Sequence, residues 1–215
     1  MDVVKDKYFY IEYVPNILCA ILFSMIISIL FGYKYILIMC VFLLGLILFF
    51  FRGKSFSLKK YNLNENYLTS PAEGKILKIY EHNNLVGISI FLNLHNIHIQ
   101  YYPCDAIIIS QIYSPGTFCP AYIFEKSKYN ERLTTSMYSK FGNIYVIQYA
   151  GQVAKKIVSF HNPNDHVRYK QGDPLGLIKF GSRVDLLVPK NIVKKILVAE
   201  NENVWIQQPL IEIKI

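Results

Sequence analysis

Residues 176–189 read Gly-Leu-Ile-Lys-Phe-Gly-Ser-Arg-Val-Asp-Leu-Leu-Val-Pro. Two short apolar segments, 175–180 and 184–188, flank a Gly181-Ser182 pair where neither segment obviously needs a flexible turn. Glycine inside a strand weakens it unless the backbone bends or is approached closely. A serine that must attack the preceding carbonyl requires such a bent peptide, and Gly181 has no side chain to block that attack. The stretch therefore predicts two β-strands on either side of a chemically special serine.

Short segments rich in β-branched and aromatic residues continue towards the N-terminus, and Asn, Pro and Gly clusters separate them. These segments are 75–80, 86–92, 96–101, 143–149 and 153–158. Short strands divided by turn signals are typical of a β-rich domain. No long amphipathic helix is evident after residue 60, and residues 119–130 predict a short helix or an extended loop. The predicted fold class is therefore mostly β.

A faint internal repeat runs through the C-terminal half. Residues 153–158 (VAKKIV) resemble 192–197 (IVKKIL), and 173–175 (DPL) resemble 208–210 (QPL). A repeated unit of strand, polar turn and Pro-Leu strand favours paired β-hairpins folded over one another. We therefore expect hairpins like those of lipoyl and biotinyl carrier domains.

The N-terminal part has a different character. Residues 17–31 and 36–51 are uncharged apolar runs, separated by Gly-Tyr-Lys at 32–34. Each run is slightly short for a helix that crosses roughly 30 Å of hydrocarbon, so we expect two tilted or shallow helices. Two buried core helices are the alternative. The pattern predicts a membrane-anchoring α-helical hairpin at 1–54, followed by a β domain at 55–215.

Basic residues flank this hairpin on both sides. Lys5 and Lys7 precede it, and Arg52 and Lys54 follow it, whereas the short loop holds only Lys34. The excess of Lys and Arg in both flanks places them, by the positive-inside rule, on the cytoplasmic side of the cell membrane. The domain after residue 54 is expected on the same side.

Charge and cysteine content narrow the choice of partners. The chain has 23 Lys and Arg against 15 Asp and Glu, which favours an anionic lipid surface or nucleic acid. No zinc-finger spacing or RNA-binding motif is evident, so we expect no nucleic-acid partner. The four cysteines form no C-x-x-C pair, so we expect neither a metal site nor a disulfide framework.

Residues 180–189 closely resemble the F-G-S-R-x-D-x-x-[LV]-P self-cleavage region of phosphatidylserine decarboxylases, above all the short prokaryotic, archaetidylserine decarboxylase-like type. The resemblance extends over roughly residues 40–215, and further family motifs occur in the expected order. They are Ser70-Pro-Ala-Glu-Gly74, the segment from Ile90 to Ile99, Pro115-Gly-Thr-Phe118, Asn130-Glu-Arg132 and Ala150-Gly-Gln-Val-Ala154.

The resemblance implies a pyruvoyl-dependent proenzyme. Ser182 would attack the carbonyl of Gly181 and split the chain into a β chain, 1–181, and an α chain, 182–215, which remain together as a heterodimer. Residue 182 would become a pyruvoyl group, whose ketone acts as an electron sink. The implied reaction converts membrane phosphatidylserine to phosphatidylethanolamine in phospholipid biosynthesis. Whether the protein also forms a homo-oligomer is left open.

Two further catalytic residues follow from the resemblance. His98 lies in an apolar, alternating segment at the family's histidine position, and histidine titrates near working pH, so we predict that it transfers protons. An ordinary half-buried histidine is the alternative. Glu73 stands where the family has an aspartate that orients or charges the histidine. Its extra methylene puts the rate of processing in question.

Two other interpretations remain open. One is a non-catalytic, membrane-anchored adaptor built from lipoyl-like hairpins, although no lysine sits at a tight hairpin tip as carrier domains require. The other is a family member that stays unprocessed, because Glu73 and residues 119–128 depart from the family pattern. Cleavage at Ser182 distinguishes the enzyme from both.

Overall fold

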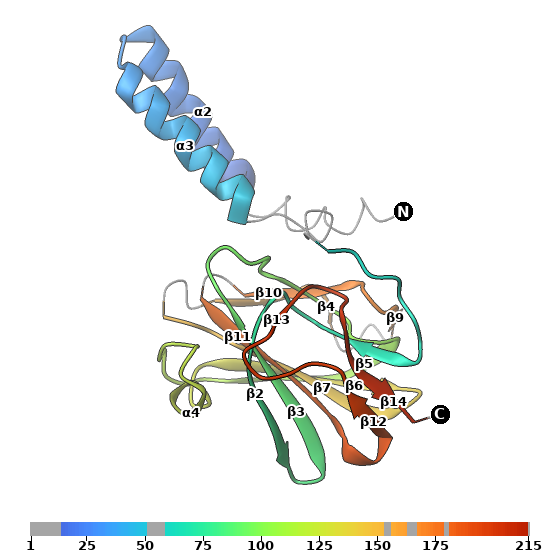
Figure 1. The fold of residues 1–215 in the computed structure, drawn as a ribbon. Helices are drawn as coiled ribbons and strands as arrows, with labels where there is room; N and C mark the ends of the chain where they lie inside the picture. The colour runs from blue at the N-terminus through green and yellow to red at the C-terminus, as the bar shows by residue number, and fades with distance from the viewer. Residues whose placement is uncertain (1–13, 51–58, 153–155, 163–166, 179–180, 215) are drawn as a thin grey trace. The chain divides into compact units, whose positions relative to one another are not determined.

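The structure is a computed structural model that describes residues 14–50, 59–152, 156–162, 167–178 and 181–214. Tertiary contacts divide the chain into two compact units, Met1–Gly53 and Lys54–Ile215. The first unit is helical in its described part, and the second consists mainly of β-strands (Figure 1). The predicted mostly β fold class is confirmed.

The first unit contains one helix at each predicted apolar run. Helix α2 spans Val14–Leu30 and helix α3 spans Lys34–Phe50, with Gly32 in a left-handed conformation (φ 70°) between them. The two helices lie side by side (Figure 1). Each has 17 residues, and no helix in the described part of the chain is long and apolar enough to cross a membrane. The structure therefore supports a helical hairpin here.

The described strands of the second unit form three sheets, and all of their pairings are antiparallel. The largest has eight strands in the order β13 (Asn203–Val204), β2 (Gly74–His82), β3 (Leu85–Leu92), β11 (Ser182–Pro189), β7 (Gly142–Tyr149), β6 (Arg132–Ser139), β5 (Ala106–Ser114) and β9 (Arg168–Tyr169). The second sheet has the strand order β1 (Tyr67–Thr69), β14 (Pro209–Ile213) and β12 (Val193–Ile196). The third has the order β4 (Ile99–Tyr101), β10 (Pro174–Ile178) and β8 (Ile157–Ser159).

Among the described residues of this unit, helical structure is limited to two short pieces. Helix α4 covers Phe124–Ser127, which agrees with the short helix predicted within 119–130, and a 3₁₀ turn, η3, covers Lys190–Ile192. The Asn83-Asn84 turn joins β2 to β3, with positive φ at both residues (48° and 61°). This is the backbone that a tight two-residue hairpin requires, and asparagine tolerates it well.

Strand β11 occupies the interior of the largest sheet, between β3 and β7. It pairs with β3 along its whole length, beginning with Ser182 opposite Leu92. Its apolar residues Val184, Leu186 and Val188 are buried in the main core. Its first residue, Ser182, is fully buried as well.

The internal repeat corresponds to two equivalent strand pairs. Strand β8 pairs with β10, and β12 pairs with β14, in both cases antiparallel. The start of the first copy, residues 153–155, lies outside the described residues. Each copy of the repeat thus overlaps one of these antiparallel strand pairs, and paired hairpins like those of carrier domains stay a prediction.

Candidate active site

The peptide before Ser182 has an unusual backbone. Gly181 has φ of 63°, in the left-handed region, yet a Cβ built on it would meet no atom of the described residues beyond its chain neighbours within 4 Å. Glycine is therefore favoured here by the backbone conformation and not by lack of space. This agrees with the bent peptide that the sequence predicts at this position.

The Ser182 hydroxyl lies in an unusual environment. The residue is 0% exposed, and among the described residues its Oγ has no hydrogen-bond partner. A buried hydroxyl without a partner costs free energy, so it calls for an explanation such as chemistry at that atom. Side chains alternate along a strand, so Ser182 faces the same side as Val184, towards the core.

His98 immediately precedes β4 and is only 2% exposed. Its carbonyl oxygen accepts hydrogen bonds from the Ile178 backbone N–H (3.2 Å) and from Gln100 Nε2 (2.7 Å). Gln148 on β7 in turn donates to Gln100 Oε1 at 2.7 Å. The histidine backbone is thus tied to β10, the strand that runs towards Ser182, and to β7, the neighbour of β11.

The strand predicted at 96–101 is shorter in the structure, and its residues do not alternate between buried and exposed. Residues 96–101 are buried without interruption, and only 99–101 form a strand. The reason is that this segment is covered from two directions: β10 pairs with β4, and Tyr101 N–H donates to the carbonyl of Pro71 at 2.8 Å. His98 is therefore a buried residue of the site region.

Glu73 lies in the turn before β2 and is 7% exposed. Its Oε1 accepts a hydrogen bond of 2.9 Å from Asn96 Nδ2. Asn96 Oδ1 also accepts from the Asn93 backbone N–H at 2.8 Å, which shapes the loop that leads into His98. The structure thus brings Glu73 to the segment that carries the predicted histidine, through a partner that the sequence did not identify.

The glycine of the Ser70–Gly74 motif has a steric role. A Cβ at Gly74 would lie 2.2 Å from the carbonyl oxygen of Phe91 on β3, so only glycine permits this approach. The Ser70 hydroxyl donates to the Ala72 carbonyl at 2.7 Å and closes the turn locally. These contacts hold Glu73 rigidly beside the sheet.

Two motifs close the loop between β5 and β6. A Cβ at Gly116 would lie 2.3 Å from the Tyr129 carbonyl oxygen. Asn130, which is fully buried, donates from Nδ2 to the carbonyls of Cys119 (2.8 Å) and Ala150 (2.9 Å). Its Oδ1 accepts from the Cys119 N–H (2.8 Å) and the Thr117 hydroxyl (3.1 Å). Asn130 thereby connects the two ends of the loop that contains α4.

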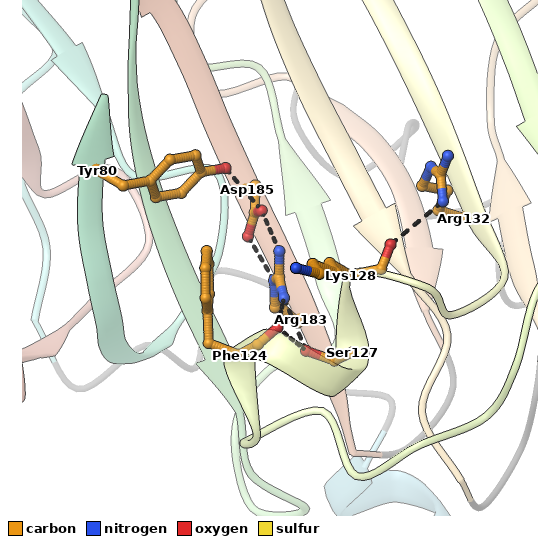
Figure 2. Close-up of polar contacts among 7 residues, drawn as sticks. All are labelled: Tyr80, Phe124, Ser127, Lys128, Arg132, Arg183 and Asp185. Atoms are coloured by element: carbon orange, nitrogen blue, oxygen red, sulfur yellow. Dashed lines mark hydrogen bonds and ion pairs between the residues drawn. The ribbon is translucent and has the colours of Figure 1, made fainter. Parts of the chain in front are cut away.

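Arg183 and Asp185 belong to the motif at 180–189, but no role could be predicted for them from the sequence. Arg183 Nε and Nη2 donate to the two carboxylate oxygens of Asp185, at 2.8 and 2.5 Å (Figure 2). Arg183 Nη1 donates to the Phe124 carbonyl (2.9 Å) and the Ser127 hydroxyl (2.7 Å) of α4, and Tyr80 donates to Asp185 at 3.0 Å. The spacing of two residues was the available signal, because it puts both charges on one face of a strand.

Burial shapes the titration of this cluster. Desolvation opposes the charge of Arg183, but the hydrogen bonds and charge of Asp185 outweigh it and raise the arginine pKa. Burial, followed by the charge of Asp185, raises the pKa of Tyr149 to about 12. At neutral pH the arginine is therefore a cation and the neighbouring phenol is uncharged.

Fold and site together define a class: a mainly β domain with a buried serine, preceded by a left-handed glycine, at the start of an interior strand. The chain belongs to the phosphatidylserine decarboxylase family, whose model matches residues 46–212. It is 34% identical over 173 residues to the phosphatidylserine decarboxylase proenzyme of Carboxydothermus hydrogenoformans, covering 77% of this chain and 78% of that protein.

Two further relatives are also named as decarboxylase proenzymes. The phosphatidylserine decarboxylase proenzyme of Ehrlichia chaffeensis is 36% identical over 163 residues, which is 72% of this chain and 70% of that protein. A Methanosarcina mazei protein whose name assigns it to archaetidylserine decarboxylase proenzymes is 37% identical over 131 residues, 61% of this chain. The aligned stretch spans 60% of that archaeal protein's length.

Proposed function

We propose that the chain is a proenzyme that cuts itself between Gly181 and Ser182 and then decarboxylates phosphatidylserine to phosphatidylethanolamine. The observation that carries the proposal is the buried, unpartnered Ser182 hydroxyl directly after a left-handed glycine. Membership of a family whose relatives are named as phosphatidylserine decarboxylase proenzymes supports the same conclusion.

Self-cleavage uses only atoms of the chain and one water. Ser182 Oγ adds to the carbonyl carbon of Gly181 and the peptide C–N bond breaks, which leaves an ester and a free amine on residue 182. Loss of the Cα proton then expels the ester oxygen, so Gly181 ends as a carboxylate and residue 182 as dehydroalanine. Tautomerisation to the imine and addition of water release ammonia and leave a pyruvoyl group on residue 182.

The residues present fit this group. Residue 182 is fully buried. Among the described residues, no atom beyond the chain neighbours lies within 4 Å of a Cβ built on Gly181, and Ser182 Oγ has no competing hydrogen-bond partner. When present, a pyruvoyl ketone supplies an electron sink for the loss of carbon dioxide from an amino acid head group. The chain's own residues must hold that head group, exclude water and deliver a proton.

We assign proton transfer to His98 and the orientation of the histidine segment to Glu73. His98 is buried and fixed through its carbonyl by Ile178 and Gln100, so its ring starts from a defined backbone position. Glu73 fixes the preceding loop through Asn96. A positioned general acid or base contributes roughly 100- to 10,000-fold to a rate.

The substrate is a membrane lipid, and the helical hairpin offers an apolar surface to reach it. Phe23 on α2 and Phe42 on α3 are 67% and 66% exposed, as are many of their apolar neighbours. Exposed apolar surface of this extent is unusual unless a membrane or a partner covers it. We propose that the hairpin holds the protein at the cell membrane, with the β domain on the cytoplasmic side.

The test is carbon dioxide release from carboxyl-labelled phosphatidylserine in mixed detergent micelles. We expect activity in the unsubstituted protein, none in Ser182→Ala, and a loss of at least about 100-fold in His98→Ala. His95→Ala, which changes an exposed histidine three residues earlier, is the matched control and is expected to remain active. Absence of release by the unsubstituted protein would leave a non-catalytic adaptor or an unprocessed family member.

A further inference from the structure

The contacts of Arg183 connect two parts of the chain that the proposed cut separates. Arg183 and Asp185 lie after the cut, on β11. All of their other partners lie before it: Tyr80 on β2, Phe124 and Ser127 on α4, and Tyr149 on β7. After cleavage, this cluster becomes a contact between the two products. It lies directly beside the new chain end, because Arg183 follows residue 182.

The guanidinium is held on every side. Its carbon lies 4.4 Å from the centroid of the Phe124 ring and 4.2 Å from that of Tyr149, so aromatic rings cover it. Its nitrogens donate to four oxygens, two of them on Asp185. Arg183 is 1% exposed and Asp185 is fully buried. A planar, bidentate and stacked arrangement of this kind fixes orientation as well as distance, which a lysine cannot reproduce.

Stability alone is a weak reason for this cluster. Desolvation of two buried charges offsets most of their attraction, and apolar residues of similar volume often stabilise a protein as well or better. A strand end has a different need, because chain termini fray unless side chains hold them. In the cleaved protein the reactive group sits on such an end, and a misplacement of about 1 Å can reduce a rate about 100-fold.

We propose that Arg183 is a positioning residue, whose bonds to Phe124 and Ser127 of the other cleavage product anchor the new chain end and set where the group on residue 182 lies. This inference rests on the proposed function. The ladder to β3 and β7 fixes the backbone of β11, and the guanidinium fixes the strand against α4. Together they hold the first residue of the new chain in the place that the uncleaved chain gave it.

The experiment compares Arg183→Lys and the milder Ser127→Ala with an Ile213→Ala control. Ile213 is a buried residue on β14, also after the cut, but far along the chain from residue 182. The readouts on the processed protein are hydrogen exchange of amides 183–186, melting temperature, and kcat and KM for phosphatidylserine. Exchange is independent of catalysis and reports fraying of the new end directly.

In Arg183→Lys we expect amides 183–186 to exchange at least about tenfold faster, because an ammonium group cannot make the bidentate and stacked contacts of the guanidinium. We expect kcat to fall about 10- to 100-fold with KM nearly unchanged, and Ser127→Ala to change both in the same direction but less. Ile213→Ala is expected to lower the melting temperature while leaving exchange at 183–186 and kcat unaltered.

Normal exchange and normal kcat in Arg183→Lys would overturn the inference. So would a loss of kcat no larger than that of Ile213→Ala at equal lowering of the melting temperature, because the effect would then be global. If Arg183→Lys cannot be purified folded, Ser127→Ala decides on the same two readouts. An unsubstituted protein that stays whole overturns the proposed function first, so the two failures are distinguishable.

Discussion

At position 181 the backbone conformation, rather than the surrounding space, selects glycine. A left-handed φ costs other L-residues roughly 1–2 kcal/mol, and asparagine tolerates it best. Because a Cβ at this position meets nothing within 4 Å among the described residues, we expect a substitution here to act through φ. The residue thus offers a clean probe of whether the bent peptide matters for cleavage.

We predict that Gly181→Val slows self-cleavage by about tenfold or more, since 1.4 kcal/mol corresponds to a factor of ten. Gly181→Asn is the matched variant and is expected to cleave at a rate between valine and glycine. A gel time course after synthesis measures both. Equal rates for valine and glycine would mean that the left-handed backbone has no part in the reaction.

Glu73 acts, in this account, through the loop that precedes His98. We therefore predict that Asn96→Ala slows self-cleavage in the same way as Glu73→Ala, because each removes one end of the 2.9 Å hydrogen bond. Glu73→Asp is expected to be processed. Asn93→Ala serves as control, since Asn93 is exposed and contributes its backbone N–H to the loop.

The measurement is the rate of processing, followed as the fraction of full-length chain over time. It decides whether Glu73 acts through Asn96 and the loop or independently of Asn96. If Asn96→Ala is processed normally while Glu73→Ala is not, the carboxylate works without this partner, and the loop is not the route of its effect.

Short motifs in the sequence predict roles for Gly181, Ser182, His98 and Glu73, and these roles stay predictions. The sequence could not identify the partners of Arg183, since Phe124 and Ser127 are far away in the chain and lie in the segment that departs most from the family pattern. The Gln100–Gln148 hydrogen bond was hidden for the same reason. Contacts between distant segments depend on the packing of the sheets, which no local pattern encodes.

At the scale of elements, the loop between β5 and β6 is organised by a single side chain. Asn130 hydrogen-bonds the N–H and carbonyl of the partly buried Cys119 and the buried carbonyl of Ala150. Each unsatisfied buried polar group costs about 1–3 kcal/mol. The loop in turn presents α4 to Arg183, so its stability and the anchoring of β11 are connected.

We predict that Asn130→Ala lowers the melting temperature of the β domain by several degrees, because 1 kcal/mol shifts it by roughly 2–4 °C in a domain of this size. Asn143→Ala, an exposed asparagine on β7, is the control and is expected to melt like the unsubstituted protein. Differential scanning calorimetry measures both. Identical melting temperatures of the two variants would show that the hydrogen bonds of Asn130 contribute nothing to the stability of the β domain.

The elements that sequence patterns predicted best are the apolar ones. Segments 75–80 and 86–92 became β2 and β3, and 143–149 became β7. Strand β6 was not singled out, because it contains three consecutive hydroxyl residues, Thr134 to Ser136, which resemble a polar loop. Pairing with β5 and β7 overrides that local preference. Strand β5 was missed as well, although it begins with an apolar run.

At the scale of the whole molecule, the chain combines an apolar helical unit with a β domain of ordinary composition. The exposed apolar side chains of α2 and α3 need a cover. We predict that the full chain sediments with membranes and is released by detergent but not by high salt, because apolar burial is not screened by ions. The chain from residue 54 onwards is the comparison, since it forms a separate compact unit.

Fractionation followed by immunodetection measures both proteins. Equal membrane association of the shortened chain would assign the attachment to the β domain, and the hairpin would then need another partner.

The central claim is that the protein cuts itself at residue 182, and intact-mass spectrometry of the purified protein under denaturing conditions tests it most directly. The account predicts two chains, residues 1–181 and residues 182–215 with a pyruvoyl group at the new end, and one full-length chain for Ser182→Ala. A single unmodified chain of 215 residues from the unsubstituted protein, or the same two fragments from Ser182→Ala, would contradict it.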